Sequence, residues 1–462
     1  MTFDELQALM QAQRAEGALL DQARSAAVDY LNGQTDQPAF PGAQAVAGLS
    51  ALDGVLPDGV SDPSAVLSRL TQAGAPATTS LGGGRYFGFV NGGLLPVALA
   101  ARWTADVWDQ NAALGVMSPM AARVEEIAQR WLVDLLGLPP QTVAGYVPGS
   151  STAIFCGLAA GRWRQLTRAN WDVNAKGMVG APTLRIVTGA DTHAAVLKAL
   201  VLLGFGTDCI EYIPCDEQGR IIADKCPNLD ARTILILQAG YVNSGAFDPF
   251  APLIAKAAEA GAWVHVDGAF GLWAAASPAL AHLTDGMAGA HSFSVDGHKT
   301  LNLPYDSGMV LCTDPEALTA AMRADGAYLV RDGARDGMAF TPEMSRRARA
   351  VELWAALAWL GRDGAAVLID GLCARAQMLA DRMQAAGFLV LNDVVFNQVL
   401  ISAGDDAETA ATLAAFQQSG VCWAGGSVWK GRKVIRFSVC SWATTEADID
   451  MAVAELSKAR NG

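Results

Sequence analysis

Length, composition and charge set the first limits on what this chain can do. It has 462 residues and a formal net charge of 33 − 46 = −13 without a basic tract, so we expect neither a nucleic acid partner nor an anionic membrane surface. Hydrophobic residues make up 52% of the chain, but no uninterrupted apolar run reaches the roughly eighteen residues that span a membrane. The 8 cysteines show no CxxC pair and no Cys/His ligand spacing, which argues against a disulfide framework and a metal site. Because segment 1–14 also lacks the apolar stretch of a secretory signal, the chain is predicted to be cytoplasmic.

Residues 1–80 are predicted to form a helical N-terminal arm. Apolar residues stand among Gln, Ala and Glu at Leu6, Met10, Leu19, Leu20 and Tyr30. A further helix over 66–73 follows the start signal Ser61-Asp62-Pro63-Ser64. The apolar side chains are too few to build a core of their own, so we expect them to pack on a second copy of the chain.

Residues 81–340 are predicted to form a large α/β domain. Helical spacing covers 94–108 and 119–136, after which short apolar runs alternate with helices such as 193–203 and 250–260. The expected strands are 184–188, 210–213, 233–238, 263–267, 292–295 and 308–312. This alternation predicts a mainly parallel sheet covered on both faces, with functional groups at the carboxyl ends of its strands.

Residues 341–462 are predicted to form a smaller C-terminal α+β domain. A long helix over 345–360 leads to a second helix, and strands near 394–401 and 434–440 precede a last helix around 446–458. The segment Ser345-Arg346-Arg347-Ala348-Arg349 is interpreted as a cationic face at the start of the long helix.

The segment Pro148-Gly149-Ser150-Ser151-Thr152-Ala153 precedes a helical pattern over 154–168. A helix N-terminus exposes free N–H groups and a partial positive charge, and it binds phosphate well when small hydroxyl residues line it. Ser and Thr also cap ordinary helices, so the segment alone leaves both interpretations open.

The stretch 264–308 carries the strongest chemical signal. The apolar run Val264-His265-Val266-Asp267 ends in an acid, and Ser292-Phe293-Ser294-Val295-Asp296-Gly297-His298-Lys299 ends in a lone lysine. A buried carboxylate and a buried amine each need a partner. A cationic heterocycle that bears an aldehyde would supply both partners, and this is the chemistry of pyridoxal 5'-phosphate (PLP). The lysine amine forms a Schiff base with the aldehyde, and an Asp pairs with the pyridinium nitrogen.

At these residues the chain resembles the group II PLP-dependent decarboxylases, which include aromatic-L-amino-acid, glutamate and diaminobutyrate decarboxylases. The motifs that carry the resemblance are HVDGAFG and SFSVDGHKTLNLPYDSG, and the similarity extends from about Tyr86 to the C-terminus. The resemblance implies a fold-type I (aspartate aminotransferase-like) large domain, a smaller α+β domain and a helical arm. It also implies PLP as the cofactor, an amino acid substrate and a homodimer.

The resemblance also implies catalytic roles for three residues. Lys299 would form the Schiff base, and Asp267 would keep the pyridine nitrogen protonated. His193 would stack on the PLP ring and reach the substrate. The competing interpretations are a surface lysine, a strand-capping Asp and a helix-capping His.

Further cofactor contacts follow from the same resemblance. Ser150 and Ser151 would anchor the phosphate, and Ala269 would pack on the ring face opposite His193. Asn243 would lie near the phenolic oxygen of the cofactor.

Ser294 and Asp296 flank the approach to Lys299, and Ser294 is placed in the cofactor site. His298 precedes the lysine, and the resemblance places it in the same site, where it would hydrogen-bond phosphate or substrate. Asp296 is left out of it, because an anion near phosphate would need a compensating donor. The glycine- and aromatic-rich segment 78–93 would lie near the substrate entrance, although a plain loop explains it about as well.

The predicted reaction is decarboxylation of an L-amino acid to the amine and carbon dioxide. Aromatic or apolar substrates are mildly favoured, because no Arg or Lys can be assigned to a side-chain carboxylate; the sequence does not identify the amino acid. Two departures from the family leave other outcomes open. Thr300 replaces the usual aromatic residue after the lysine, and the expected flexible lid, 329–340, has no Tyr, since Tyr328 precedes it. The alternatives are a carbon–carbon lyase or aldolase, an aminotransferase, or a non-catalytic protein that keeps the fold.

Overall fold

A seven-stranded sheet in the order β1-β7-β6-β5-β4-β2-β3 forms the centre of the computed structural model, which describes residues 1–324 and 335–462. Its strands are β1 (Val143–Val147), β2 (Arg185–Gly189), β3 (Ile210–Ile213), β4 (Thr233–Gln238), β5 (Trp263–Asp267), β6 (Ser292–Asp296) and β7 (Gly308–Cys312). β7 is antiparallel to both of its neighbours, β1 and β6, and the remaining pairs are parallel. All strands except β7 therefore run in one direction and end at the same edge.

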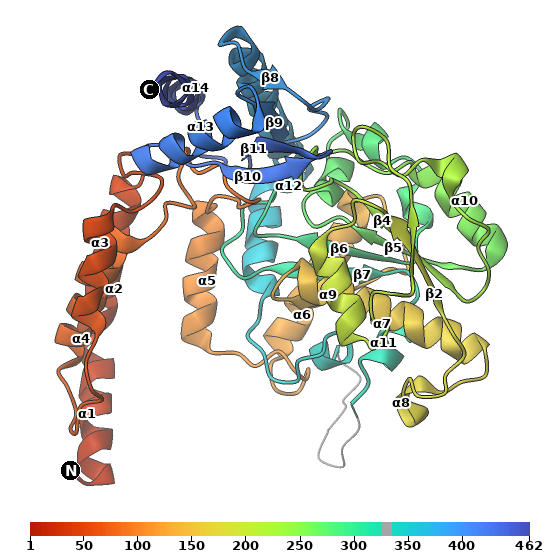
Figure 1. The fold of residues 1–462 in the computed structure, drawn as a ribbon. Helices are drawn as coiled ribbons and strands as arrows, with labels where there is room; N and C mark the ends of the chain where they lie inside the picture. The colour runs from red at the N-terminus through yellow and green to blue at the C-terminus, as the bar shows by residue number, and fades with distance from the viewer. Residues whose placement is uncertain (325–334) are drawn as a thin grey trace.

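Helices cover both faces of this sheet (Figure 1). They are α5 (Pro96–Trp108), α6 (Pro119–Leu135), α7 (Ser150–Arg168), α8 (Val173–Lys176), α9 (Ala194–Leu202), α10 (Phe250–Ala260) and α11 (Pro315–Ala321). Alternate residues of β4 enter two different cores: Leu235 and Leu237 face one, and Ile234 and Ile236 face the other. A strand that is buried on both sides needs apolar residues at successive positions, which explains its continuous apolar run.

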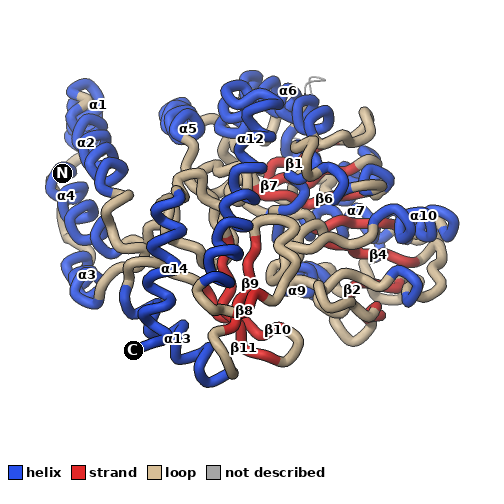
Figure 2. Tube along the Cα trace, turned by 90° about the horizontal axis from the view of Figure 1, so that it is seen from above, coloured by secondary structure: helices blue, strands red, loops and turns tan. Residues whose placement is uncertain are grey.

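A second, antiparallel sheet has the order β10-β11-β9-β8 (Figure 2). It consists of β8 (Leu389–Val390), β9 (Gln398–Ser402), β10 (Gly425–Trp429) and β11 (Arg432–Ser438), with helices α12 (Ala350–Ala385), α13 (Asp406–Ser419) and α14 (Glu446–Asn461). α12 is broken at Gly361, whose φ of 60° and ψ of −168° are open essentially to glycine alone. The fold class is confirmed, whereas the domain boundaries near 80 and 340 stay predictions.

The N-terminal arm consists of α1 (Phe3–Glu16), α2 (Ala18–Gly33), α3 (Ala43–Gly48) and α4 (Pro63–Gly74), and it stands beside the body (Figure 1). None of these helices contains a buried residue. Within the part of the chain that the structure describes, no helix is both long and apolar enough to cross a bilayer.

Three of the differences from the sequence predictions bear on the candidate site or its surroundings. Strand β1 was not expected; its Gly145 weakens the strand pattern, but a Cβ there would collide with the Phe340 carbonyl. Helix α7 begins at Ser150 rather than at 154, which places the hydroxyl residues in its first turn. The expected cationic face at 345–349 is wrong in part, because Arg346 is buried with Nη1 2.7 Å from Glu125 Oε1.

The structure describes only residues 335–340 of the predicted lid, 329–340. Residues 329–334 of it lie outside the described residues, and so does Tyr328. The remainder does not fit the expectation of little burial, since Met338 is buried. Arg335 Nε also donates to Glu125 Oε2 at 3.0 Å, so this end of the segment is anchored to the body.

Candidate active site

The predicted catalytic residues follow strand ends at one edge of the large sheet. Asp267 is the last residue of β5, and it pairs in register with Gln238 of β4 and Ser294 of β6. Lys299 lies just after the end of β6, and His193 follows β2 as the N-cap of α9. Because these parallel strands end at the same edge, the structure gathers the side chains there.

Lys299 is held by a carboxylate. Its Nζ lies 2.8 Å from Asp296 Oδ2. Burial alone would lower the pKa of Lys299, but the Asp296 and Asp267 carboxylates outweigh it and raise the pKa above the ordinary value. The resting amine is therefore a charged ammonium at neutral pH.

Asp296 belongs to this group, although the sequence interpretation left it out. The compensating donors exist: Ser150 N at 2.5 Å, Ser150 Oγ at 2.7 Å and Lys299 Nζ. Burial disfavours the charged carboxylate, yet Lys299 and His298 lower its pKa on balance. Its position three residues before Lys299 was the available sequence signal.

Asp267 is buried and presents one engaged oxygen. Its Oδ1 accepts hydrogen bonds from Ser294 Oγ at 3.0 Å and from Ala269 N at 3.2 Å. In the described part of the chain, no hydrogen bond engages Oδ2. This fits a residue that is oriented by neighbours while one oxygen stays available to a cationic ring nitrogen.

His193 is oriented through its backbone and its ring. Its amide donates to Gln238 Oε1 at 2.7 Å, and its Nδ1 accepts from Ala195 N at 3.2 Å. The proton of the neutral ring is therefore assigned to Nε2. Partial burial lowers the pKa of His193, with Asp267 opposing the shift and Lys299 and Arg436 adding to it.

The N-terminus of α7 forms the end of the site where a phosphate was expected. Ser150 is buried and bound to Asp296, whereas Ser151 is exposed in the first turn. His298 Nδ1 accepts from Ser307 N at 3.2 Å, and its ring stacks on Tyr305 with centroids 4.1 Å apart. The dipole of α7 and the Ser151 hydroxyl suit a phosphate.

Ala269 and Asn243 are less directly tied to this group. Ala269 lies beside Asp267, where its amide donates to the carboxylate. Asn243 Oδ1 accepts from Ser427 Oγ of β10 at 2.9 Å, which places it at the contact between the two sheets. The cofactor roles proposed for both residues stay predictions.

Arg436 is a functional candidate that the sequence interpretation missed. It lies in β11, is buried, and donates from Nη1 to Val242 O at 2.7 Å. No described residue accepts a hydrogen bond from its Nε. Burial lowers the pKa of Arg436 to about 10, as expected for a cation that lacks a counter-ion. An arginine inside the apolar run 434–437 was the available signal.

The glycine- and aromatic-rich segment packs directly on the Lys299 turn. Gly92 N donates to His298 O at 3.1 Å, and a Cβ at Gly92 would collide with the Lys299 carbonyl. Tyr86 and Phe89 stack on Trp423 with ring centroids 5.0 and 5.9 Å away. The segment therefore packs beside the candidate site, and its place at the substrate entrance stays a prediction.

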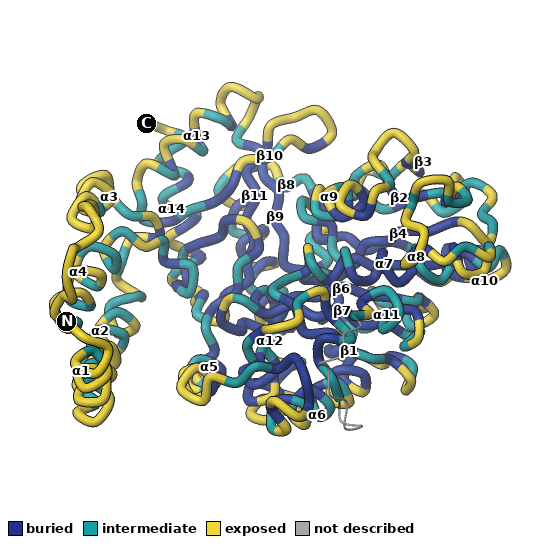
Figure 3. Tube along the Cα trace, turned by 90° about the horizontal axis from the view of Figure 1, so that it is seen from below, coloured by how far each residue is buried: buried dark blue, intermediate teal, exposed yellow. Residues whose placement is uncertain are grey.

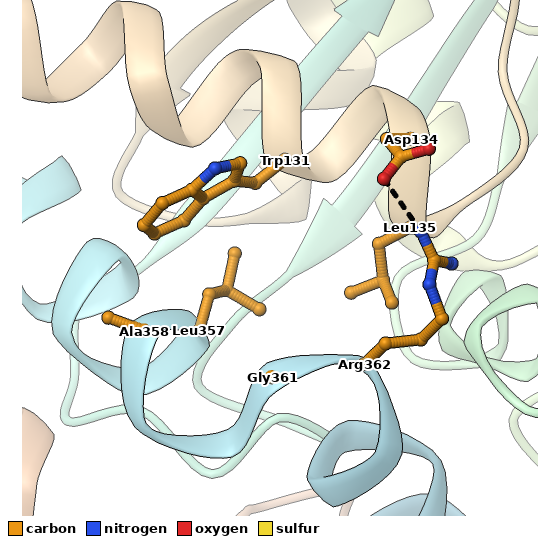
Figure 4. A pocket seen from close by; sticks show the side chains of 7 residues that line it. All are labelled: Trp131, Asp134, Leu135, Leu357, Ala358, Gly361 and Arg362. Atoms are coloured by element: carbon orange, nitrogen blue, oxygen red, sulfur yellow. Dashed lines mark hydrogen bonds and ion pairs between the residues drawn. The ribbon is translucent and has the colours of Figure 1, made fainter.

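A pocket of about 410 Å³ at the break in α12 is a separate feature (Figure 4). It is lined by Trp131, Asp134, Leu135, Leu357, Ala358, Gly361 and Arg362. Its two charged residues bind each other, with Arg362 Nη2 2.6 Å from Asp134 Oδ2. Because it shares no residue with the Lys299 group and offers no free acid or base, we do not assign the chemistry to it.

Comparison with solved structures identifies the fold. The Oryza sativa protein TDC, solved with PLP and tryptamine, superposes with a TM-score of 0.88 at 21% identity, covering 100% of this chain and 98% of that one. The 4-hydroxyphenylacetaldehyde synthase of Rhodiola rosea superposes with a TM-score of 0.84 at 18% identity, covering 100% of this chain and 99% of that one. One fold therefore serves proteins with different named reactions.

A domain profile shows the family, and sequence relatives agree with it. L-2,4-diaminobutyrate decarboxylase of Rhizobium meliloti is 28% identical over 357 residues, which are 72% of this chain and 68% of that protein. Aspartate 1-decarboxylase of Aliivibrio fischeri is 31% identical over 209 residues, 44% of this chain and 38% of that protein. The profile of the pyridoxal-dependent decarboxylase conserved domain matches residues 78–402. The chain therefore belongs to the pyridoxal-dependent decarboxylase family and is a PLP-dependent amino acid decarboxylase.

Proposed function

We propose that this decarboxylase acts on an L-amino acid with an aromatic or apolar side chain. The observation that carries the proposal is an aromatic group: Tyr86 and Phe89 belong to the segment packed on the Lys299 turn, and both rings stack on Trp423. Stacked rings offer a substrate side chain an apolar surface.

The nearest cation of that segment does not face the aromatic group. Arg85 donates from Nη2 to the carbonyls of Thr35 and Gln37, the latter at 2.8 Å, and its Nε lies 3.8 Å from Asp448 Oδ1. A guanidinium that is engaged in this way is poorly placed to pair with a substrate side-chain carboxylate. This supports an apolar substrate over an acidic one.

Arg436 is proposed to bind the α-carboxylate of the substrate. It is a buried cation with an unused Nε, and it contributes to lowering the pKa of His193, which puts it within electrostatic range of the site. A planar guanidinium matches a carboxylate well.

The chain's own residues would divide the chemistry as follows. PLP, when bound, supplies an aldehyde that takes up the substrate amine and a charged ring that accepts the electron pair left by carbon dioxide. Lys299 would hold the cofactor covalently at rest. Asp267, fixed by Ser294 and Ala269, would keep the ring nitrogen protonated. Ser151 and the α7 N-terminus would hold the phosphate.

His193 is proposed to return a proton to Cα after the carboxylate has left. Because burial lowers its pKa, only a minority of His193 is protonated at pH 7, so this step should speed up as the pH falls toward that pKa. His193→Gln should bind PLP yet form amine slowly; amine formation at the parental rate would assign the proton to another group.

The proposal is tested by measuring carbon dioxide release from purified protein with a panel of amino acids. The panel includes L-tryptophan, L-tyrosine, L-phenylalanine, L-leucine, L-aspartate and L-2,4-diaminobutyrate. We expect turnover with the aromatic or apolar members. Turnover confined to L-aspartate or L-2,4-diaminobutyrate would contradict the proposed substrate class and leave the family assignment intact.

A second outcome on the same fold is an aldehyde or keto acid product in place of the amine. The described half of the lid, 335–340, contains no Tyr that could return the proton. The likeness to an aldehyde synthase is consistent with such variation but does not favour it by itself. Product analysis distinguishes amine from aldehyde or keto acid.

The active assembly is proposed to be a homodimer in the cytoplasm. The exposed apolar residues of the arm support the dimer, and Leu20 is 67% exposed. The acidic charge without a basic tract supports a small-molecule substrate over nucleic acid.

A further inference from the structure

Asn302, in the turn after Lys299, uses its whole side chain to join three segments. It is fully buried. Its Oδ1 accepts from Gly93 N at 2.5 Å and from Trp442 N at 2.9 Å. Its Nδ2 donates to Thr300 O at 2.8 Å and to Cys440 O at 3.0 Å. Only an amide can accept two hydrogen bonds and donate two in this arrangement.

The backbone around Asn302 strengthens the same junction. Asn302 N donates to Lys299 O at 3.0 Å, and Asn302 O accepts from Leu95 N at 2.9 Å. Trp442 Nε1 donates to Leu94 O at 3.0 Å. The φ of Asn302 is 58°, a left-handed conformation that Asn tolerates better than most residues with a side chain.

We propose that Asn302 is a positioning residue for Lys299. It fixes the turn 299–302 against both the 93–95 segment and the 440–442 segment that follows β11. The fixed turn keeps the Lys299 amine within hydrogen-bonding distance of Asp296. This inference rests on the proposed role of Lys299 as the covalent partner of PLP.

The arrangement also couples Lys299 to the C-terminal part of the chain. One oxygen, Asn302 Oδ1, accepts the amides of both Gly93 and Trp442, so the two segments cannot separate without breaking a buried bond. If Lys299 is fixed by the covalently bound cofactor, these two amides should open less often. By linkage, loss of the Asn302 bonds should weaken attachment of PLP.

Two variants separate the amide from the backbone conformation. Asn302→Gly keeps the positive φ and removes all side-chain bonds. Asn302→Asp keeps the shape but turns a carboxylate oxygen toward the carbonyls of Thr300 and Cys440. The matched control is Asn397→Asp, since Asn397 is equally buried and its partners Val439 O and Gln398 Nε2 lie beside the smaller sheet.

The apoprotein of each variant is titrated with PLP, reduced with borohydride, and digested to quantify PLP fixed on Lys299. We expect both Asn302 variants to need about tenfold more PLP for half-maximal fixation, the effect of about one lost buried hydrogen bond. Asn397→Asp should stay within about twofold of the parent at a temperature where all proteins are folded.

Hydrogen exchange supplies a readout that does not depend on the cofactor or on turnover. In the apoprotein, the amides of Gly93 and Trp442 should exchange faster in Asn302→Gly than in the parent or in Asn397→Asp. Parental exchange of these amides and parental PLP fixation in the Asn302 variants would overturn the inference alone. Failure of the parent protein to fix PLP on Lys299 would overturn it together with the proposed function.

Discussion

The strand β6, which leads to Lys299, is buried, whereas the helices of the N-terminal arm are largely exposed (Figure 3). Around Lys299 the polar groups are buried and paired within the chain: Asp296 is 1% exposed and Asn302 fully buried, and both have several partners. In the arm the apolar groups are exposed: Phe3 is 72% and Leu20 67% exposed, and no arm helix buries a residue. Asp296 and Asn302 therefore find their partners within one chain, whereas the apolar residues of the arm are left uncovered by the described part of that chain.

Polar hydrogen bonds, rather than buried apolar side chains, hold the arm helices α2 and α4 together. Gln22 of α2 donates to Ser64 O at 3.0 Å and to Ser68 Oγ at 2.9 Å, which ties α2 to α4. Between arm and body lies an apolar cavity of about 410 Å³. Its lining includes Val28, Leu31, Leu94, Leu99, Trp103 and Trp442. On the proposed dimer, changes around Lys299 should therefore alter the chemistry, and changes in the arm should alter association.

Replacement of Lys299 should have the largest effect on activity and no effect on association through the arm. Lys299→Ala removes the amine that follows β6, so we expect complete loss of turnover and of PLP fixed by borohydride. The association state should not change. Lys256→Ala, which removes a half-buried lysine bonded to Cys226 O at 2.5 Å, is the control. Full activity of Lys299→Ala would refute the assignment of the site.

Changing Asp267 should have the next largest effect. Asp267→Asn keeps the shape and the bond from Ser294 but removes the charge proposed to hold the ring proton. We expect a loss of about two to four decades in kcat, roughly 3–5 kcal/mol, with PLP still bound. The measurement is kcat with the best substrate, alongside the cofactor absorbance. An unchanged kcat would make Asp267 a structural residue.

The central sheet was predictable because its signal is local. Four strands, 210–213, 233–238, 263–267 and 308–312, begin and end at the predicted residues. In β4 and β7 the signal is an apolar run that is buried on both faces of the sheet. β1 was missed because glycine carries no strand signal. The reason for Gly145 lies across the chain, at Phe340.

The positions of the candidate site residues were predictable from the sequence, whereas their roles rest on the family resemblance and stay predictions. Lys299, Asp267 and His193 stand at strand or helix ends that the pattern locates. Asp296 and Arg436 could not be assigned, because their value depends on partners distant in sequence: Ser150 for Asp296, and the absence of a described acceptor for Arg436 Nε. The sequence gives the position of a charged residue, whereas the hydrogen-bond and ion-pair partners of that residue are seen only in the folded structure.

The arm offers the next test, directed at the second region. Leu20→Asp places a charge on an exposed arm residue, which should leave the unfolding temperature of the chain nearly unchanged. If the arm packs on a second copy, the dimer should dissociate about a hundredfold more readily. Sedimentation across a concentration series measures this. Val179→Asp, at a 93% exposed body position, is the control, and equal association of both variants would argue against the arm as the interface.

The smallest expected effect concerns the charge that holds Lys299. Attachment to an aldehyde requires the neutral amine, and Asp296 is the main cause of the raised pKa of Lys299, since burial alone would lower it. In the parent apoprotein, the rate of PLP fixation should therefore rise about tenfold per pH unit below that pKa. In Asp296→Asn the pKa of Lys299 should fall, so the same rise in fixation rate should appear at lower pH, and fixation at pH 7 should be faster than in the parent.

Ser150→Ala is the control, because it keeps the Asp296 charge and loses only the 2.7 Å bond. It should weaken PLP binding without moving the pH profile of fixation. If the profile stays in place in Asp296→Asn as well, the Lys299 pKa is set by its burial and by Asp267, and Asp296 serves only to cap α7.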